Sequence, residues 1–213
     1  LEERRVNGSY LHLQDFIRRT NCGIEQLTLL VQIGAFRFTG KSKKELLWEA
    51  NYLQKKVKPE GNGVQNLFID KPMTFELPKL TDHPLDDRYD ELEIFGFPLA
   101  NPFAMVDADP NKFVLADDIG NHIGKVVDVL LYYIAHKHVI TKNLQDMYFG
   151  TFVDSNLNWI DTVHFPNVAN RYPLDKAGFY QATGKVTDDF GVYSVEVQTV
   201  KKLGYKLRTY ADS

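Results

Sequence analysis

Aromatic and cationic side chains gather between residues 137 and 171, in types and spacing that suit contact with a nucleic-acid strand. Phe149 and Thr151 alternate with Phe152 along one expected strand, and Phe165 ends the next. An exposed ring on such a strand can stack a base, which contributes about 1–3 kcal/mol per base. Further side chains could contact phosphates: Lys137, His138, Lys142 and Arg171.

The alternation alone leaves the choice of face open, because both faces of the strand 147–153 are mostly apolar. Each aromatic residue can therefore be a core residue or a ligand contact. Acidic residues also occupy this part of the chain, and they oppose phosphate binding: Asp146, Asp154, Asp161, Asp188 and Asp189.

A second basic group, Lys41, Lys43 and Lys44, surrounds the expected start of a helix. Ser42 is a candidate N-cap, and Glu45 three residues later would complete a capping box. The lysines can be a solvated helix start or a set of phosphate contacts, and composition favours the first.

Residues for catalysis do not assemble. Cys22 has no histidine near it, no G-x-S-x-G motif is present, and no glycine-rich phosphate loop follows a strand. His136 and His138 share one strand face but lack a third ligand, so we expect neither a metal nor a cofactor. The aspartates between Asp70 and Asp90 lie in a linker and a helix start. We therefore predict a non-enzymatic fragment.

Five strand signals between residues 124 and 205 must position the candidate residues. They cover residues 125–140, two strands within 147–165 joined across an Asn- and Asp-rich turn, 179–186 and 192–203. A longer excursion, 166–178, follows the third strand. Closure removes exposed strand edges, so this pattern predicts a small five-stranded OB barrel, a fold that commonly binds single strands.

Together with the barrel, the rest of the sequence predicts an α+β fold. It should have an N-terminal helical segment at 1–54, a linker at 55–87 and a C-terminal tail at 206–213. Within 88–123 we expect short helices that lead to the barrel, which itself spans 124–205. One helix should begin at the end of the linker, cover Asp86–Phe95 and end at Gly96, and another should cover 112–123. Inside the linker, Gln65, Leu67 and Phe68 form an apolar cluster that either docks a partner or pins the linker.

Composition limits the strength of any nucleic-acid binding. The 213-residue chain carries a net charge of −3 and has a pI of about 6.1, so binding should be local, modest and salt-sensitive. One cysteine fits the reducing cytoplasm, and no apolar run is long enough to cross a membrane. The start lacks an initiator Met, so we expect the chain to be part of a longer protein.

Three stretches resemble one family in order. Residues 10–48 contain DFIRR and LVQIGAF…GK, residues 89–99 read YDELEIFGFPL, and the expected barrel contains MYFGTFVDSN, DTVHFP and GKVTDDFGVYSVEV. Together they resemble the C-terminal region of the alpha subunit of bacterial replicative DNA polymerase III, in a Bacteroidetes-like form. The matched region is the end of its helix-hairpin-helix segment and its OB domain.

The resemblance implies a cytoplasmic, non-catalytic part of a polymerase whose catalytic aspartates lie upstream. It implies weak, sequence-independent binding of single-stranded template by the OB domain, with Phe149, Thr151 and Val153 facing outward. It also implies docking to a sliding clamp through a Q-x-x-L-F peptide. Here Val64 stands at the Gln position, and Gln65, Leu67 and Phe68 supply the rest.

The alternative is a structural OB module that contacts other replisome subunits and does not bind DNA. Ile140 replaces a cation of the family pattern, which favours this second interpretation.

Overall fold

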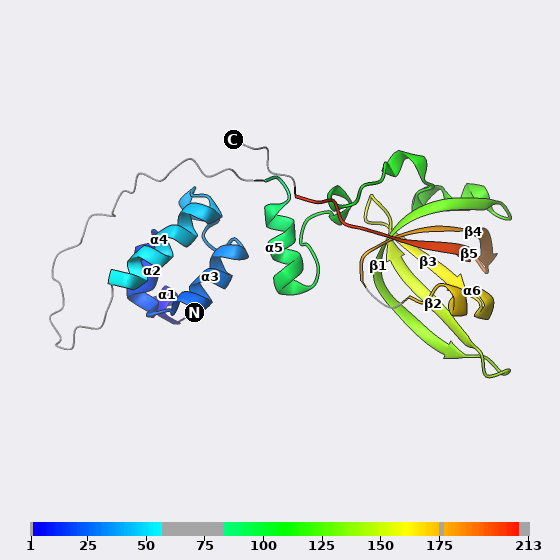
Figure 1. Cartoon of the computed structure of the whole chain (residues 1–213), viewed down its shortest axis with the longest axis horizontal. Helices are drawn as coiled ribbons and strands as arrows, with labels where there is room; N and C mark the ends of the chain where they lie inside the picture. Colours follow the sequence, from blue (N-terminus) through cyan, green and yellow to red (C-terminus); the bar gives the residue numbers. More distant parts are fainter. Residues whose placement is uncertain (1, 57–82, 175–176, 209–213) are drawn as a thin grey trace. The chain divides into compact units, whose positions relative to one another are not determined.

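Two compact units make up the chain, Leu1–Pro98 and Leu99–Arg208. The computed structural model describes residues 2–56, 83–174 and 177–208. The first unit is helical and the second is built around a β-sheet (Figure 1). Each unit buries a hydrophobic cluster of its own.

The first unit consists of short helices joined by tight turns. Its helices are α1 (Glu2–Asn7), α2 (Leu13–Thr20), α3 (Ile24–Gln32), the 3-10 turn η1 (Arg37–Thr39), α4 (Lys43–Lys56) and α5 (Asp86–Phe95). Apolar residues spaced three or four apart face inward from α2, α3 and α4, as the helical period requires. They form this core with Phe36: Leu13, Ile17, Leu27, Val31, Leu46, Ala50 and Leu53.

The ends of two helices follow the predicted capping chemistry. At the start of α4, the Glu45 amide donates to Ser42 Oγ at 3.3 Å, and the Ser42 amide donates to Glu45 Oε2 at 2.7 Å. This reciprocal pair is the capping box expected from the sequence. Gly96 ends α5 with a φ of 80°, a left-handed conformation that glycine adopts without a steric cost.

Five strands close into a barrel in the second unit. They are β1 (Val126–Ile140), β2 (Asp146–Val153), β3 (Trp159–His164), β4 (Phe179–Asp189) and β5 (Val192–Leu203). The order around the barrel is β1-β2-β3-β5-β4; the β3–β5 pair is parallel and the other pairs are antiparallel. This is an OB-type barrel, and the predicted α+β class is confirmed.

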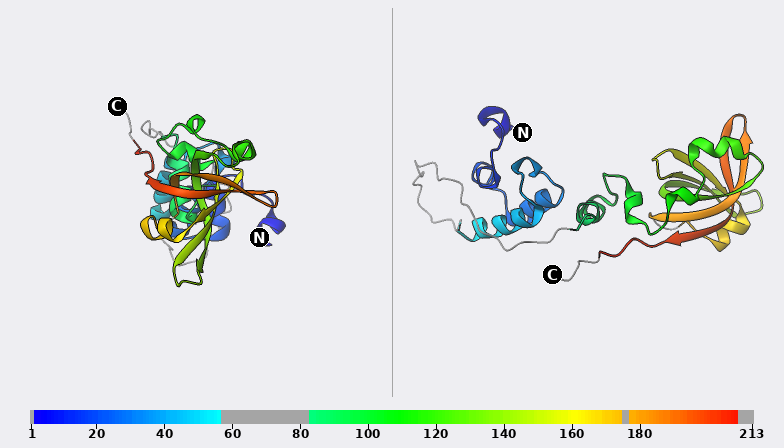
Figure 2. Two further views of the ribbon diagram at one scale, coloured as in Figure 1. Left: turned by 90° about the vertical axis from the view of Figure 1, so that its right-hand side faces the viewer. Right: turned by 90° about the horizontal axis from the view of Figure 1, so that it is seen from above.

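Strand β1 is long and strongly curved, and it pairs with its two neighbours along successive halves (Figures 1 and 2). Its first half pairs with β4 from Val126 to Tyr132, and its second half pairs with β2 up to Ile140. The register shifts between Tyr133 and Ala135. Such an irregularity bends a strand and lets it leave one partner for another.

Short helices fill the segments outside the strands. They are η2 (Pro102–Met105), η3 (Pro110–Lys112), η4 (Ala116–His122) and α6 (Pro166–Arg171). The short helix expected over 112–123 is present as the 3-10 helix η4, which begins only at Ala116, four residues later than expected. Helix α6, which the sequence analysis placed in an irregular excursion, begins with Pro166 at its first position and contacts β2, β3 and β5.

The turn between β2 and β3 is organised by one buried carboxylate. Asp154 is 1% exposed and accepts hydrogen bonds from the backbone amides of Asn156, Asn158 and Ala116 at 2.8–2.9 Å. Local Asp-to-backbone bonds of this kind explain why the Asp- and Asn-rich sequence forms a tight turn here. The bond to Ala116 also fastens η4 to the barrel.

Candidate nucleic-acid interface

Strand β2 turns its phenylalanines to opposite sides. Phe149 is 44% exposed, whereas Phe152 is 1% exposed and belongs to the barrel core. Because successive side chains alternate, Thr151 lies on the outward side with Phe149, as the resemblance implies. Val153 differs from that expectation: it has the same parity but is only 6% exposed. The outward face therefore ends before the last residue of β2.

Cross-strand neighbours surround Phe149 on this outward face. Lys137 of β1 is directly opposite on one side, and Val163 of β3 is opposite on the other. The next row places Thr151 beside Asp161, and the Thr151 hydroxyl donates to Asp161 Oδ1 at 3.0 Å. The face thus combines an exposed ring, a lysine and a hydroxyl–carboxylate pair.

Trp159 is the residue that the sequence analysis missed. It is 65% exposed at the start of β3, and it shares the outward parity of Asp161 and Val163. Trp159 pairs with Val153, four residues along β2 from Phe149, which places the two rings roughly 13 Å apart along the strands. The signal was present in the sequence, two residues before Asp161. Trp159 thus adds an exposed ring on β3, beyond the point where the exposed side chains of β2 end.

Other predicted contacts lie at the edges of this face or away from it. Phe165 is 40% exposed, follows β3 on the outward parity and forms the N-cap of α6. Arg171 ends α6, and its guanidinium lies 5.4 Å from the centroid of the Tyr172 ring. Lys142 is exposed in the connection between β1 and β2.

His138 projects to the side opposite Lys137. It pairs with Tyr148, the two rings lie 5.2 Å apart, and its Nε2 is 2.6 Å from Asp146 Oδ1. The structure therefore brings together Lys137, Phe149 and Thr151. It does not bring His138 to the same face.

A buried histidine lies beneath the outward face. His164 is 1% exposed, and its Nε2 lies 2.9 Å from Thr162 Oγ1, which donates in turn to the Gly150 carbonyl. Burial, with a smaller contribution from the charge of His136, lowers the pKa of His164 to about 4. The imidazole is thus neutral at pH 7 and donates through Nε2. A side chain at position 150 would collide with this arrangement, since an added Cβ would meet Thr162 Oγ1 at 2.7 Å.

The three lysines around the start of α4 are each paired with a carboxylate. Lys41 Nζ is 2.6 Å from Glu49, and Lys43 Nζ lies 2.8 Å from Asp87 and 2.9 Å from Asp90. Lys44 Nζ is 3.4 Å from Asp86. Gln65, Leu67 and Phe68, the expected clamp-docking residues, lie outside the described residues.

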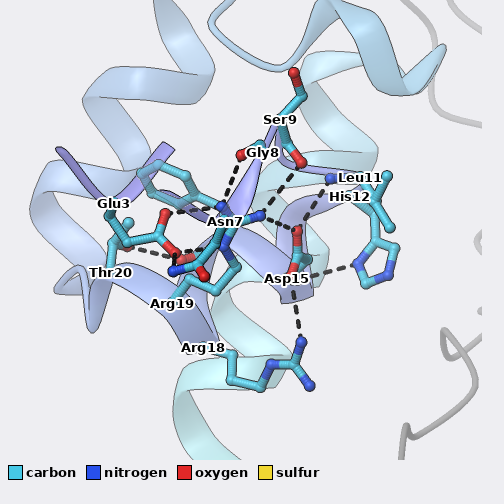
Figure 3. A network of polar contacts seen from close by, with 11 residues as sticks. Glu3, Asn7, Gly8, Ser9, Leu11, His12, Asp15, Arg18, Arg19 and Thr20 are labelled. Carbon is cyan, nitrogen blue, oxygen red and sulfur yellow. Dashed lines mark hydrogen bonds and ion pairs between the residues drawn. The ribbon is translucent and has the colours of Figure 1, made fainter. Parts of the chain in front are cut away.

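The second arginine of the DFIRR stretch is fully engaged within its own unit. Figure 3 shows the Arg19 guanidinium between Glu3 and Asp15. Its five N–H groups donate to the two Glu3 oxygens, Asp15 and the carbonyls of Gly8 and Ser9, at 2.7–3.2 Å. These bonds join α1 and the following loop to α2, so Arg19 has a structural role. Arg18, in contrast, has a side chain that is 68% exposed.

No group of three or more His, Cys, Asp or Glu side chains that could hold a metal ion occurs within 2–56, 83–174 and 177–208. Across the same part of the chain, no helix combines the length and apolar character needed to span a membrane.

Comparison with known protein families identifies one motif in the N-terminal part of the chain. Residues 1–46 match the family model of the helix-hairpin-helix motif. No curated protein matches the chain. A helix-hairpin-helix segment and a small closed β-barrel together fit a nucleic-acid-binding module.

Proposed function

We propose that this chain is a non-catalytic part of the alpha subunit of a bacterial replicative DNA polymerase of the DNA polymerase III type. Its parent would be a cytoplasmic DNA-directed DNA polymerase, and its barrel would hold single-stranded template weakly and without sequence preference. The helix-hairpin-helix match and the OB-type barrel support the proposal in the order that the family resemblance requires.

The observation that carries the DNA-binding role is the outward face with Phe149, Trp159 and Lys137. Both rings are substantially exposed, and Lys137 lies directly beside Phe149. Exposed rings stack bases of any identity, and a neighbouring cation contacts the backbone phosphate. Such a face would follow a single strand without reading its sequence.

Fluorescence anisotropy with labelled oligo-dT at about 20 mM and then about 200 mM salt tests this role. We expect micromolar or weaker binding that falls steeply with salt, because phosphate contacts release counterions. Phe149→Ala and Trp159→Ala should each cost about 1–3 kcal/mol of binding free energy. Val126→Ala is the matched control, since Val126 is 55% exposed but pairs with Lys185 of β4, away from Phe149. Equal effects of all three substitutions would contradict the stacking role.

We also propose that residues 64–68 dock a sliding clamp, on the strength of the resemblance alone. A clamp pull-down with the double substitution Leu67→Ala and Phe68→Ala tests it. Retained capture by the double variant would remove this proposal.

A second candidate is a structural OB module that contacts other replisome subunits. Acidic side chains on the outward face favour it: Asp161 is exposed beside Thr151, and Glu196 of β5 pairs with Val163 in the row of Phe149. This candidate predicts no oligo-dT binding at either salt concentration, which separates it from the first.

A further inference from the structure

Helix α5 carries carboxylates on two successive turns. Asp86, Asp87, Asp90 and Glu91 are spaced so that i and i+4 neighbours fall on the same side of the helix. Glu93 lies on the same helix and is exposed. The acidic residues of α5 therefore divide into a set that faces the rest of the helical unit and one that does not.

The facing set meets a group of cations from η1 and the first turn of α4. Lys43 lies within 2.9 Å of both Asp87 and Asp90, and Lys44 lies 3.4 Å from Asp86. Arg37 Nη2 is 3.6 Å from Glu91 and 3.9 Å from Asp87. Three cations and four carboxylates thus form one continuous network, here called the α5 ion-pair network.

Burial shows which charges of the network are withdrawn from solvent. Glu91 is 3% exposed, and the side chain of Lys43 is 17% exposed. Burial alone would lower the pKa of Lys43, but hydrogen bonds to Asp87 and Asp90 outweigh it and raise the pKa. Lys43 therefore stays charged, and its ammonium group is already paired with the carboxylates of Asp87 and Asp90.

The cations of the network belong to the part of the chain that matches or adjoins the helix-hairpin-helix motif, residues 1–46. They flank the start of α4, where the helix dipole adds to the attraction for anions. A row of carboxylates presents to these cations the same charge that phosphates would present. Both cannot occupy Lys43 at once.

We propose that α5 is an acidic cover that competes with nucleic-acid phosphates for Arg37, Lys43 and Lys44. The inference rests on the proposed nucleic-acid-binding function and adds a regulation to it. With α5 in place, the helical unit contributes little to binding, and the barrel face dominates. A polyanion that displaces α5 would then contact Arg37, Lys43 and Lys44.

The test compares oligo-dT binding by the full chain and by the variant Asp86→Asn, Asp87→Asn, Asp90→Asn. We expect about tenfold or greater tightening near 20 mM salt. The log–log salt slope should steepen by about 1.4, since the variant removes the carboxylates beside Lys43 and Lys44 but keeps Glu91 beside Arg37, and each single-strand phosphate contact adds roughly 0.7. The control variant, Glu2→Gln, Glu25→Gln, Glu93→Gln, changes net charge by the same amount at exposed positions outside the α5 ion-pair network. It should leave the slope unchanged.

Two additions separate this inference from the barrel proposal. Adding Lys43→Ala and Lys44→Ala to the α5 variant should remove its gain in oligo-dT affinity. Adding Phe149→Ala to the α5 variant should leave that gain in place. If oligo-dT binds the wild type through the barrel but the α5 variant binds equally, the cover is overturned and the barrel role stands. If only the α5 variant binds, the cover stands and the barrel role fails. If neither binds, both are overturned, because freed cations then attract no phosphate.

Discussion

His164 has only one of its two ring nitrogens bonded within the part of the chain that the structure describes. Nε2 donates to Thr162, whereas the buried Nδ1 has no hydrogen-bond partner among those residues. Protonation would place a positive charge on a ring that is 1% exposed, and a buried unpaired charge is costly. The folded state therefore resists protonation, and the unfolded state does not.

The barrel should lose stability as pH falls from about 6.5 toward the lowered pKa of His164, about 4. In that window the unfolded state binds the proton and the folded state does not, so the loss between pH 7 and pH 5 should be about 2 kcal/mol. Urea unfolding in a Trp48→Phe background measures it, because Trp159 then reports on the barrel alone. His164→Gln should remove most of this pH dependence. An undiminished loss in His164→Gln would contradict the assignment.

Single residues were the hardest level to predict from the sequence. Alternation left the face of Phe149 open, and the family resemblance placed Phe149 and Val153 outward together, although Val153 is buried. The basic residues Lys43 and Lys44 looked like a solvated helix start or a phosphate site. Their carboxylate partners lie more than forty positions away in the chain, and local patterns carry no such information.

At the scale of elements, the β4–β5 hairpin contains an unusual residue. Asp189 pairs with Val192, so the turn consists of Phe190 and Gly191 alone, with φ angles of 53° and 86°. Two-residue turns with both φ angles positive prefer Asn-Gly, because a bulky side chain is strained there. Phe190 is completely exposed and gains nothing from packing in exchange.

Phe190→Asn should therefore stabilise the barrel by about 0.5–1 kcal/mol, since Asn tolerates the left-handed region and no buried surface is lost. Urea unfolding at pH 7 measures the change. Phe190→Ala is the matched control, because it removes the same exposed ring without relieving the backbone. Equal stabilisation by Ala and Asn would show that the ring, and not the backbone, carries the strain.

The strands were predicted well because their sequences alternate. Each of the five observed strands overlaps an expected one, and the largest discrepancy, at the end of β4, arises because the tight turn lets pairing continue to Asp189. Helix α6 was missed because it is only Pro166–Arg171, too short for a helical period to appear in the sequence.

At the scale of the whole molecule, the two units have separate hydrophobic cores. The barrel could be predicted from the strand count and from the general cost of open edges. Its closure depends on the parallel β3–β5 pairing, which joins strands separated by β4 in the chain. Local sequence patterns do not show which distant strands pair. Closure was therefore predicted from a general argument, and the structure supplies the pairing that closes the barrel.

The place where the chain enters the barrel unit lies next to the place where it leaves. Val106 pairs with Tyr205, and the Lys206 amide donates to the Met105 carbonyl at 2.7 Å. Because both ends of the unit meet at this bridge, tension along the chain would load these few bonds first and would not stretch the strands. The bridge would carry the load from one end of the unit to the other, so the barrel could keep its shape while the chain on either side is pulled.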